Sequence, residues 1–219
     1  MKKIFKNVVI GKNAKIGEFV IIGEPPKGYK EGDLPTAIGD NCVIRSHSVI
    51  YAGNKIGDNF QTGHGVNLRE FNKIGDNVSI GTHSIIEHHI KIEDKVRIHS
   101  NVFIPEYSYL KKGCWIGPCV TVTNVLHPLC KKAKECAKGA IIGENTKVGA
   151  NVTILPDIII GNNCLVGAGS LVTKNLLDDN FVYAGTPAKK IKHIKEINCP
   201  YDLVKMPYEI EEEKNDSFG

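Results

Sequence analysis

A short segment, Thr123-Asn124-Val125-Leu126-His127-Pro128, carries the first side chain with clear chemical potential, the amide of Asn124. An amide of this kind can donate a hydrogen bond to an amine or a hydroxyl group, or accept one from it. The segment interrupts a regular sequence pattern, so we expect it to leave the body of the fold and to form one wall of a cleft. Asn124 is therefore predicted to contact a polar ligand; the alternative is that it only caps a turn.

Small residues and lysines gather in a second stretch, Gly167-Ala168-Gly169-Ser170 with Lys174, followed by Ala184-Gly185-Thr186-Pro187-Ala188-Lys189-Lys190. Side chains this small let an extended ligand lie against backbone N–H and C=O groups. The ammonium groups of the lysines are suited to holding phosphates. The stretch therefore indicates a site for a long ligand that bears phosphate, although a Gly-Ala-Gly run is a weak signal when taken alone.

Three histidines, His47, His83 and His88, are separated by 36 and 5 residues. Three imidazoles that converge and leave one position open can bind zinc and support hydration chemistry. A second set of potential metal ligands comprises His127, Cys130, Cys136 and Cys199. Because its spacing fits no standard zinc motif, free thiols are the preferred interpretation and no metal is assigned to the chain.

A six-residue repeat defines the elements that must position these side chains. From Ile38 to Val122 an aliphatic residue recurs at every sixth position, with Thr62 as the one exception, and shorter series run over 4–22 and 142–172. Glycine often follows the aliphatic residue, and a small or apolar residue comes four positions after it. An amphipathic helix would need a period near 3.6. Each unit is therefore expected to be one short strand followed by a tight corner.

Three such units would complete one 18-residue coil of a triangular prism, with the aliphatic side chains stacked inward. A single coil cannot bury its own core, so the stacking of coils must supply the stability. We predict an all-β, parallel β-helix over 1–175, with loop excursions at 23–37 and 123–141. Residues 176–219 are expected to form a helical cap and a frayed tail, with a short basic helix that begins at Thr186-Pro187-Ala188 and ends near Ile197.

Composition limits the partners and the location of the protein. The chain has 219 residues, a net charge of only +4 and seven cysteines. It has no segment near the roughly 20 apolar residues that cross a bilayer, and its N-terminal apolar run is too short for a signal peptide. An odd number of cysteines without an export signal favours free thiols in the cytoplasm. We therefore predict a cytoplasmic protein with no nucleic-acid or membrane partner.

The C-terminal repeats resemble those of the hexapeptide acyltransferases, which form left-handed β-helices. The likeness rests on Val148-Gly149-Ala150-Asn151-Val152-Thr153-Ile154-Leu155-Pro156, Val166-Gly167-Ala168-Gly169-Ser170-Leu171-Val172-Thr173-Lys174 and Ala184-Gly185-Thr186-Pro187-Ala188-Lys189. A second likeness, to the branch that N-acetylates amino sugars on nucleotides, such as the UDP-linked 3-amino-glucuronate N-acetyltransferases, rests on Ile116-Gly117-Pro118, Thr123-Asn124 and Pro128. That branch usually has Trp-His-Phe where this chain has Arg69-Glu70-Phe71, and it differs again at Val125 and Leu129. These departures leave the acceptor sugar open.

The resemblance implies a homotrimer with sites between subunits and acetyl-CoA as the acyl donor, with no metal required. The residues that it implies for binding acetyl-CoA are Ala150, Gly167, Ala168, Lys174, Pro187 and Lys189. It also implies that Asn124 contacts the acceptor amine, which attacks the thioester directly. A positioned base would accept the proton that the amine must lose, and the candidates for this base are Glu70, His83 and His127.

The predicted function is thus an acyl-CoA-dependent N-acyltransferase, of the N-acetyl type by resemblance, that acts on a nucleotide-linked amino sugar in glycan biosynthesis. An O-acetyltransferase or an amino-acid acyltransferase on the same scaffold is the first alternative. The spacing of His47, His83 and His88 also resembles the zinc ligands of γ-class carbonic anhydrases, which share this fold. A catalytically silent scaffold protein is the third alternative.

Overall fold

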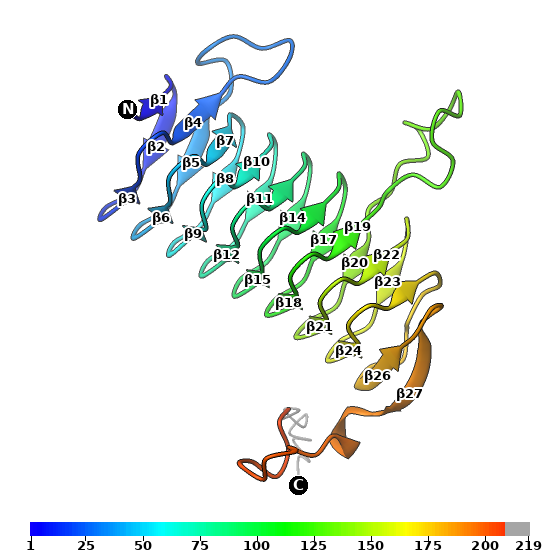
Figure 1. The fold of residues 1–219 in the computed structure, drawn as a ribbon. Coiled ribbons are helices and arrows are strands. Elements are labelled where there is room, and N and C mark those ends of the chain that lie inside the picture. The colour runs from blue at the N-terminus through cyan, green and yellow to red at the C-terminus, as the bar shows by residue number, and fades with distance from the viewer. Residues whose placement is uncertain (209–219) are drawn as a thin grey trace, which may run out of the picture.

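The computed structural model describes residues 1–208, and these form a left-handed parallel β-helix with three flat faces (Figure 1). Its short strands fall into three sheets of nine, eight and ten strands. Strands that are three apart in sequence are neighbours in a sheet, so each coil contributes one strand to each face. The fold class predicted from the six-residue repeat is confirmed.

We call the three faces sheets A, B and C. Sheet A contains β1 (Lys3–Ile4), β4 (Ile21–Glu24), β7 (Val49–Tyr51), β10 (Asn67–Leu68), β13 (Ile85–Ile86), β16 (Phe103–Ile104), β19 (Thr121–Val122), β22 (Thr153–Ile154) and β25 (Leu171–Val172). Sheet B contains β2 (Val8–Ile10), β5 (Thr36–Ile38), β8 (Lys55–Ile56), β11 (Lys73–Ile74), β14 (Lys91–Ile92), β17 (Tyr109–Leu110), β20 (Ile141–Ile142) and β23 (Ile159–Ile160). Sheet C contains β3 (Lys15–Ile16), β6 (Val43–Ile44), β9 (Gln61–Thr62), β12 (Ser79–Ile80), β15 (Arg97–Ile98), β18 (Trp115–Ile116), β21 (Lys147–Val148), β24 (Leu165–Val166), β26 (Phe181–Ala184) and β27 (Lys189–His193).

The repeated aliphatic side chains form the core inside the prism. Ile50, Leu68 and Ile86, which occupy the same position in three successive coils, are fully buried, and burying such a side chain contributes roughly 1.5–3 kcal/mol. Thr62, the exception in the repeat, is buried as well, and its hydroxyl accepts a hydrogen bond from the Arg45 backbone N–H at 2.9 Å. The polar atom is therefore satisfied inside an otherwise apolar column.

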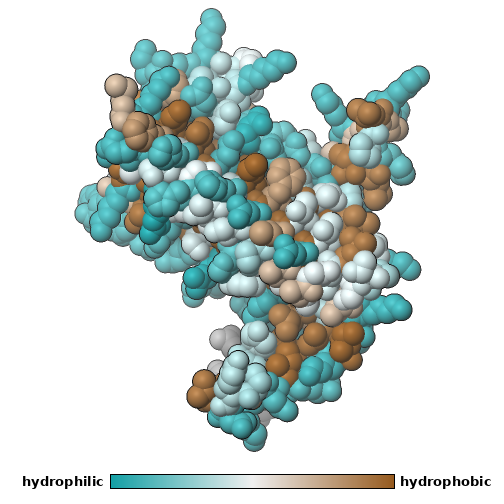
Figure 2. Space-filling view, viewed as in Figure 1, coloured by the Kyte–Doolittle hydropathy of each residue, from teal (hydrophilic) through white to brown (hydrophobic). Residues whose placement is uncertain are grey.

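Both loop excursions leave the prism at one edge, where the chain turns from sheet A into sheet B (Figure 1). The first loop connects β4 to β5, and the second connects β19 to β20. The connections themselves run over 25–35 and 123–140, whereas the loops were predicted at 23–37 and 123–141. The space-filling view shows apolar surface on the second loop, whose Leu126 and Leu129 are 63% and 100% exposed (Figure 2).

The prediction of a C-terminal helix from Thr186 to about Ile197 is wrong. β26 pairs in parallel with β24, and β27 turns back to pair antiparallel with β26. Only one turn of 3-10 helix follows, Ile194–Glu196. The edge of β24 presents backbone N–H and C=O groups that need partners, and strand pairing satisfies them better than a helix of like-charged lysines would. The predicted frayed tail, the last ten residues, lies outside the described residues.

None of the helical structure in residues 1–208 is long and apolar enough to span a membrane.

Candidate functional site

A row of polar side chains follows the edge between sheets A and B, at one position of successive coils. Glu70, His88, Glu106 and Asn124 are each separated by 18 residues, which is one coil. Because the strands that precede them pair in register, Asn67 with Ile85 and Ile85 with Phe103, these side chains succeed one another along the edge. We call Arg69, Glu70, Glu87, His88, Glu106 and Asn124 the polar ladder.

The first half of the polar ladder is an ion-pair network. Arg69 Nε and Nη2 donate to the two carboxylate oxygens of Glu70, each at 2.9 Å, and Glu70 is only 6% exposed. Arg69 Nη1 also donates to Glu87 Oε2 at 3.4 Å. The hydrogen bonds to Glu70 raise the pKa of the Arg69 guanidinium. Since both of its oxygens are engaged, Glu70 is better placed to anchor Arg69 than to accept a proton from a ligand.

Glu87 is a partly buried carboxyl group of the polar ladder. Burial raises its pKa, and the nearby carboxylate of Glu106 adds to the increase. The positive charge of Arg69 opposes this effect but does not cancel it. Glu87 therefore holds a proton more readily than an exposed glutamate does.

The second half of the polar ladder combines an imidazole, a carboxylate and an amide. His88 Nε2 lies 3.5 Å from Glu106 Oε1, and Asn124 Nδ2 donates to Glu106 Oε2 at 2.6 Å. His88 Nδ1 is also 2.8 Å from His89 Nδ1, so one ring donates and the other accepts. An imidazole beside a fixed carboxylate is the arrangement of a general base and its orienting group. The Asn124 amide retains its Oδ1 as an acceptor for a ligand.

Aromatic rings run beside the polar ladder at the next position of each coil. The ring centroids of Phe71 and His89 are 5.0 Å apart, and those of His89 and Tyr107 are 5.8 Å apart. Tyr29, from the first loop, meets the edge of Phe71 at 5.9 Å. This edge thus presents hydrogen-bonding groups and flat rings together, which suits a polar ligand that also carries a ring.

Two of the four predicted catalytic residues belong to the polar ladder. Glu70 and Asn124 stand at opposite ends of the polar ladder. His83 lies on another edge, between sheets C and A, where its ring covers Gly65. His127 is exposed in the second loop, where its carbonyl oxygen accepts from the Cys130 N–H at 3.2 Å. These two histidines are therefore separate from the polar ladder within one chain.

The predicted metal ligands do not converge. His47 and His83 share the edge between sheets C and A, whereas His88 lies on the edge between sheets A and B. Across residues 1–208 no three His, Cys, Asp or Glu side chains are grouped as they would be around a metal ion, and this includes the set with His127 and Cys199. The carbonic anhydrase alternative therefore has no support from the geometry of one chain.

Most of the residues that the resemblance implies for binding acetyl-CoA meet at the C-terminal end of the edge between sheets C and A. Gly169 N–H donates to Ala150 O at 2.8 Å, and Gly167 N–H donates to Tyr183 O at 2.8 Å. The turn that contains Pro187 packs beside β25, because Ala188 N–H donates to Leu171 O at 2.8 Å. Space is open above Gly169. The result is a surface of small side chains, with Ala168 within it.

The two lysines of this set are divided between two places. Lys189 is exposed at the start of β27, directly after the turn that contains Pro187. Lys174 is exposed beyond the end of β25, on the edge between sheets A and B. Only Lys189 is therefore next to the small residues within one chain.

Sequence reasoning missed the contact between His88 and Glu106. A signal was present: Glu70, His88, Glu106 and Asn124 have the same phase in an 18-residue coil. In a solenoid, side chains of equal phase in adjacent coils are neighbours about 4.8 Å apart. The missed residues follow from applying the coil length, and not only the six-residue repeat, to the polar positions.

Comparisons with known proteins agree with this architecture. The model of the bacterial transferase hexapeptide family (six repeats) matches residues 73–106 and 139–174, and that of the hexapeptide repeat of succinyl-transferase matches residues 35–67. No curated protein sequence gives a significant match.

Two solved structures illustrate the likeness of fold. The UDP-N-acetylglucosamine acyltransferase of Arabidopsis aligns with a TM-score of 0.57 and 14% identity, over 88% of this chain and 72% of that one. The UDP-N-acetylglucosamine acyltransferase of Campylobacter jejuni aligns with a TM-score of 0.50 and 19% identity, over 88% of this chain and 75% of that one.

Proposed function

We propose that this chain, a hexapeptide-repeat acyltransferase, transfers an acyl group from an acyl-CoA to the amino group of a nucleotide-linked sugar. The observation that carries the proposal is the series of contacts from His88 through Glu106 to Asn124, at 3.5 and 2.6 Å. It supplies a base, a carboxylate that orients the base, and an amide that can hold the acceptor.

His88 acts as the general base in this proposal. The acceptor amine must be neutral when it attacks the thioester carbon, and its nitrogen must lose a proton as the C–N bond forms. In this step His88 Nδ1 turns from its contact with His89 and takes that proton, while Glu106 at Nε2 stabilises the imidazolium. Asn124 Nδ2 holds Glu106 in place, and Asn124 Oδ1 accepts a hydrogen bond from the amine. A base in this position contributes roughly 10²–10⁴ in rate. The acyl-CoA supplies the thioester; as its C–S bond breaks, the departing thiolate takes the proton from the His88 imidazolium and leaves as the free thiol of coenzyme A.

The surface of small residues around Ala150, Gly167, Ala168 and Pro187 supports binding of the donor. An extended pantetheine arm can lie against exposed backbone there, because no large side chain stands in the way. Lys189 follows the turn that contains Pro187, so its ammonium group can contact a phosphate of the bound acyl-CoA. We retain Lys174 as a second candidate for a phosphate contact. We propose acetyl-CoA as the donor.

A neighbouring copy of the chain is part of this proposal. The side chains of His88 and Glu106 are 26% and 29% exposed, so one protomer forms only one wall of the site. The exposed Leu126 and Leu129 of the second loop offer apolar contact area beside that wall. We propose a homotrimer in which the adjacent subunit closes the site, and we propose the cytoplasm as its location.

A thiol-release assay tests the proposed function. Acetyl-CoA and longer acyl-CoA donors are offered with UDP- and dTDP-linked amino sugars and with the matching sugars that carry hydroxyl in place of amine. We expect thiol release that requires the amine. Turnover of only the hydroxyl sugars or of serine would replace the N-acyl assignment, and no release with any acceptor would contradict acyl transfer to sugars altogether.

A further inference from the structure

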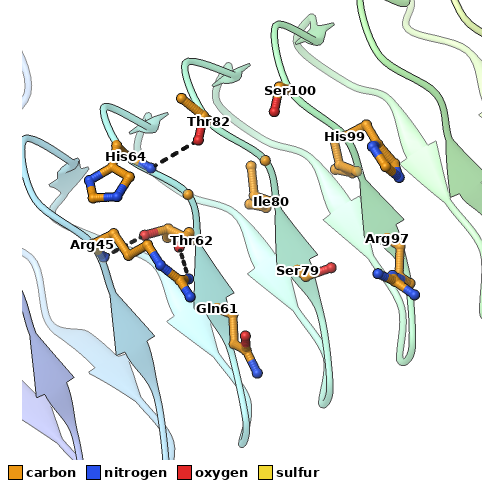
Figure 3. A pocket seen from close by; sticks show the side chains of 13 residues that line it. Arg45, Gln61, Thr62, His64, Ser79, Ile80, Thr82, Arg97, His99 and Ser100 are labelled. Carbon is orange, nitrogen blue, oxygen red and sulfur yellow. Dashed lines mark hydrogen bonds between the residues drawn. The ribbon is translucent and has the colours of Figure 1, made fainter.

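A hollow of about 310 Å³ lies on the outer face of sheet C, away from the polar ladder. Figure 3 shows Arg45 with Gln61 on one side of it and Arg97 with His99 on the other. Ser79 on β12 lies between them. Neither the sequence interpretation nor the proposed acyl transfer gives this hollow a role.

The hollow exists because the middle one of three adjacent coils has only a small outward side chain, that of Ser79. Ser79 is in register with Gln61 on one side and Arg97 on the other. Because the serine side chain is shorter than its two neighbours, the surface is depressed at this strand. Gly63 and Gly81 continue the depression at the corner. A Cβ at either glycine would collide with the backbone of the next coil, so the packing of the coils itself keeps this surface low.

The lining of the hollow is positively charged and holds no carboxylate. Its ionisable side chains are those of Arg45, His64, Arg97 and His99. In the described part of the chain neither arginine pairs with a carboxylate, in contrast to Arg69. Arg45 Nη1 donates to Thr62 O at 2.8 Å, which holds this guanidinium beside the hollow. Uncompensated charge around a preformed concavity favours an anionic ligand.

We propose that this hollow binds a diphosphate ester. Guanidinium groups match phosphate oxygens with paired N–H donors, and the hydroxyl groups of Ser79, Thr82 and Ser100 add neutral donors around the floor. The backbones of Arg45 and Arg97 are three coils apart, about 14 Å at strand spacing. We expect each guanidinium to approach one of two linked phosphates from its own side of the hollow.

The hollow is separate from the polar ladder, but its ligand class rests on the proposed function, because the proposed acyl transfer also uses coenzyme A and a nucleotide. Two kinds of metabolite carry the same diphosphate chemistry, a nucleoside diphosphate and coenzyme A. The test therefore begins with inorganic pyrophosphate, which carries neither base nor pantetheine, and then compares UDP, dTDP and coenzyme A as competitors. The competitor that displaces pyrophosphate at the lowest concentration identifies the source.

The protein contains its own reporter for this experiment. Trp115 is the single tryptophan of the chain, its backbone pairs with Arg97 across sheet C, and its ring stacks edge to face on His99 at 4.8 Å. Pyrophosphate, which does not absorb where indole is excited, should change the Trp115 fluorescence in a saturable way.

Three variants and one matched control define the outcome. We expect Arg45→Gln and Arg97→Gln each to raise the Kd for pyrophosphate at least tenfold, the scale of one lost charged contact. Ser79→Gln should also weaken binding without any change of charge, because it fills the floor with the side chain that Gln61 already presents in the same row. Lys55→Gln, which removes one positive charge from sheet B, should leave the Kd unchanged.

Several results would overturn the proposal. One is the absence of a saturable signal from the unmodified protein at millimolar pyrophosphate. Another is equal weakening by Lys55→Gln and Arg97→Gln, which would mean attraction to overall charge only. A third is a change of oligomeric state in Arg97→Gln with pyrophosphate affinity retained, measured by sedimentation, which would make this face a contact between copies of the chain. Should Arg97→Gln not fold, Ser79→Gln alone decides the matter.

Discussion

Two edges of the prism share the same 18-residue period, but one repeats a single residue type and the other carries a different residue type in each coil. On the edge between sheets B and C one residue type recurs, in Asp40, Asp58, Asp76 and Asp94. Each of these carboxylates accepts a hydrogen bond from a backbone N–H of the preceding coil, as Asp76 does from Asp58 N–H at 2.8 Å. On the edge between sheets A and B the residue type changes at every coil, from Glu70 to His88 to Glu106 to Asn124.

The contrast separates structure from chemistry in a repeat protein. Joining one coil to the next requires the same bond each time, so the same residue recurs. A binding site requires different groups around one ligand, so an equivalent position varies from coil to coil. We call the edge between sheets A and B the variable edge and the edge between sheets B and C the constant edge. Both loop excursions leave from the variable edge, as expected if that edge binds a ligand.

The largest expected effect comes from removing the proposed base on the variable edge. His88→Ala should lower kcat/KM for the acceptor by about 10²–10⁴, the contribution of a positioned base, and should leave the urea unfolding midpoint almost unchanged. The measurement is thiol release at saturating acyl-CoA.

His83→Ala is the matched control for this variant, because it removes an imidazole from a neighbouring edge and should keep full activity. The reverse result, loss with His83→Ala and activity in His88→Ala, would move the base to the edge between sheets C and A and restore His83 to the role predicted from the sequence.

Asn124→Ala should have the next largest effect. The amide donates to Glu106 at 2.6 Å and is proposed to accept from the substrate amine, so its loss should lower kcat/KM at least tenfold. Asn124→Asp is a useful second variant, because it removes the donor and places a second negative charge against Glu106. Wild-type kinetics in Asn124→Ala would mean that the acceptor does not reach this end of the polar ladder.

The same contrast explains what could be predicted from the sequence. The recurrent aliphatic positions predicted the strands and both loops, because a solenoid uses one local rule in every coil. Asn124 and Glu70 were identified as isolated residues, whereas His88 and Glu106 become meaningful only when a whole coil is counted between them. The C-terminal helix was predicted from the local signal Thr186-Pro187, but the partner that decided the outcome, the open edge of β24, is distant in sequence.

The repeated aspartate on the edge between sheets B and C leads to a prediction about stability. Asp76→Ala removes the acceptor of Asp58 N–H, and we expect it to lower the free energy of unfolding by about 0.5–1.5 kcal/mol, the net contribution of one hydrogen bond. Its kcat/KM should stay within twofold of the unmodified protein. Urea denaturation compares it with Asn124→Ala, which should show the opposite pattern; a large loss of activity in Asp76→Ala would mean that the two edges do not divide these roles.

The smallest expected effect is that of Glu87→Gln on the variable edge, where the free energy of unfolding should change with pH. Burial raises the pKa of Glu87 in the folded protein above its unfolded value, so at neutral pH the ionised group destabilises the fold. As pH falls through the folded pKa, the native state binds this proton before the unfolded state does, and the penalty disappears. Glu87→Gln should therefore be more stable than the unmodified protein at pH 7, by less than about 1 kcal/mol because the side chain is partly exposed and faces Arg69. Urea denaturation at pH 7 and again near pH 4 measures the difference, which should shrink at the lower pH; a difference that is equal at both values would assign the effect to packing and not to charge.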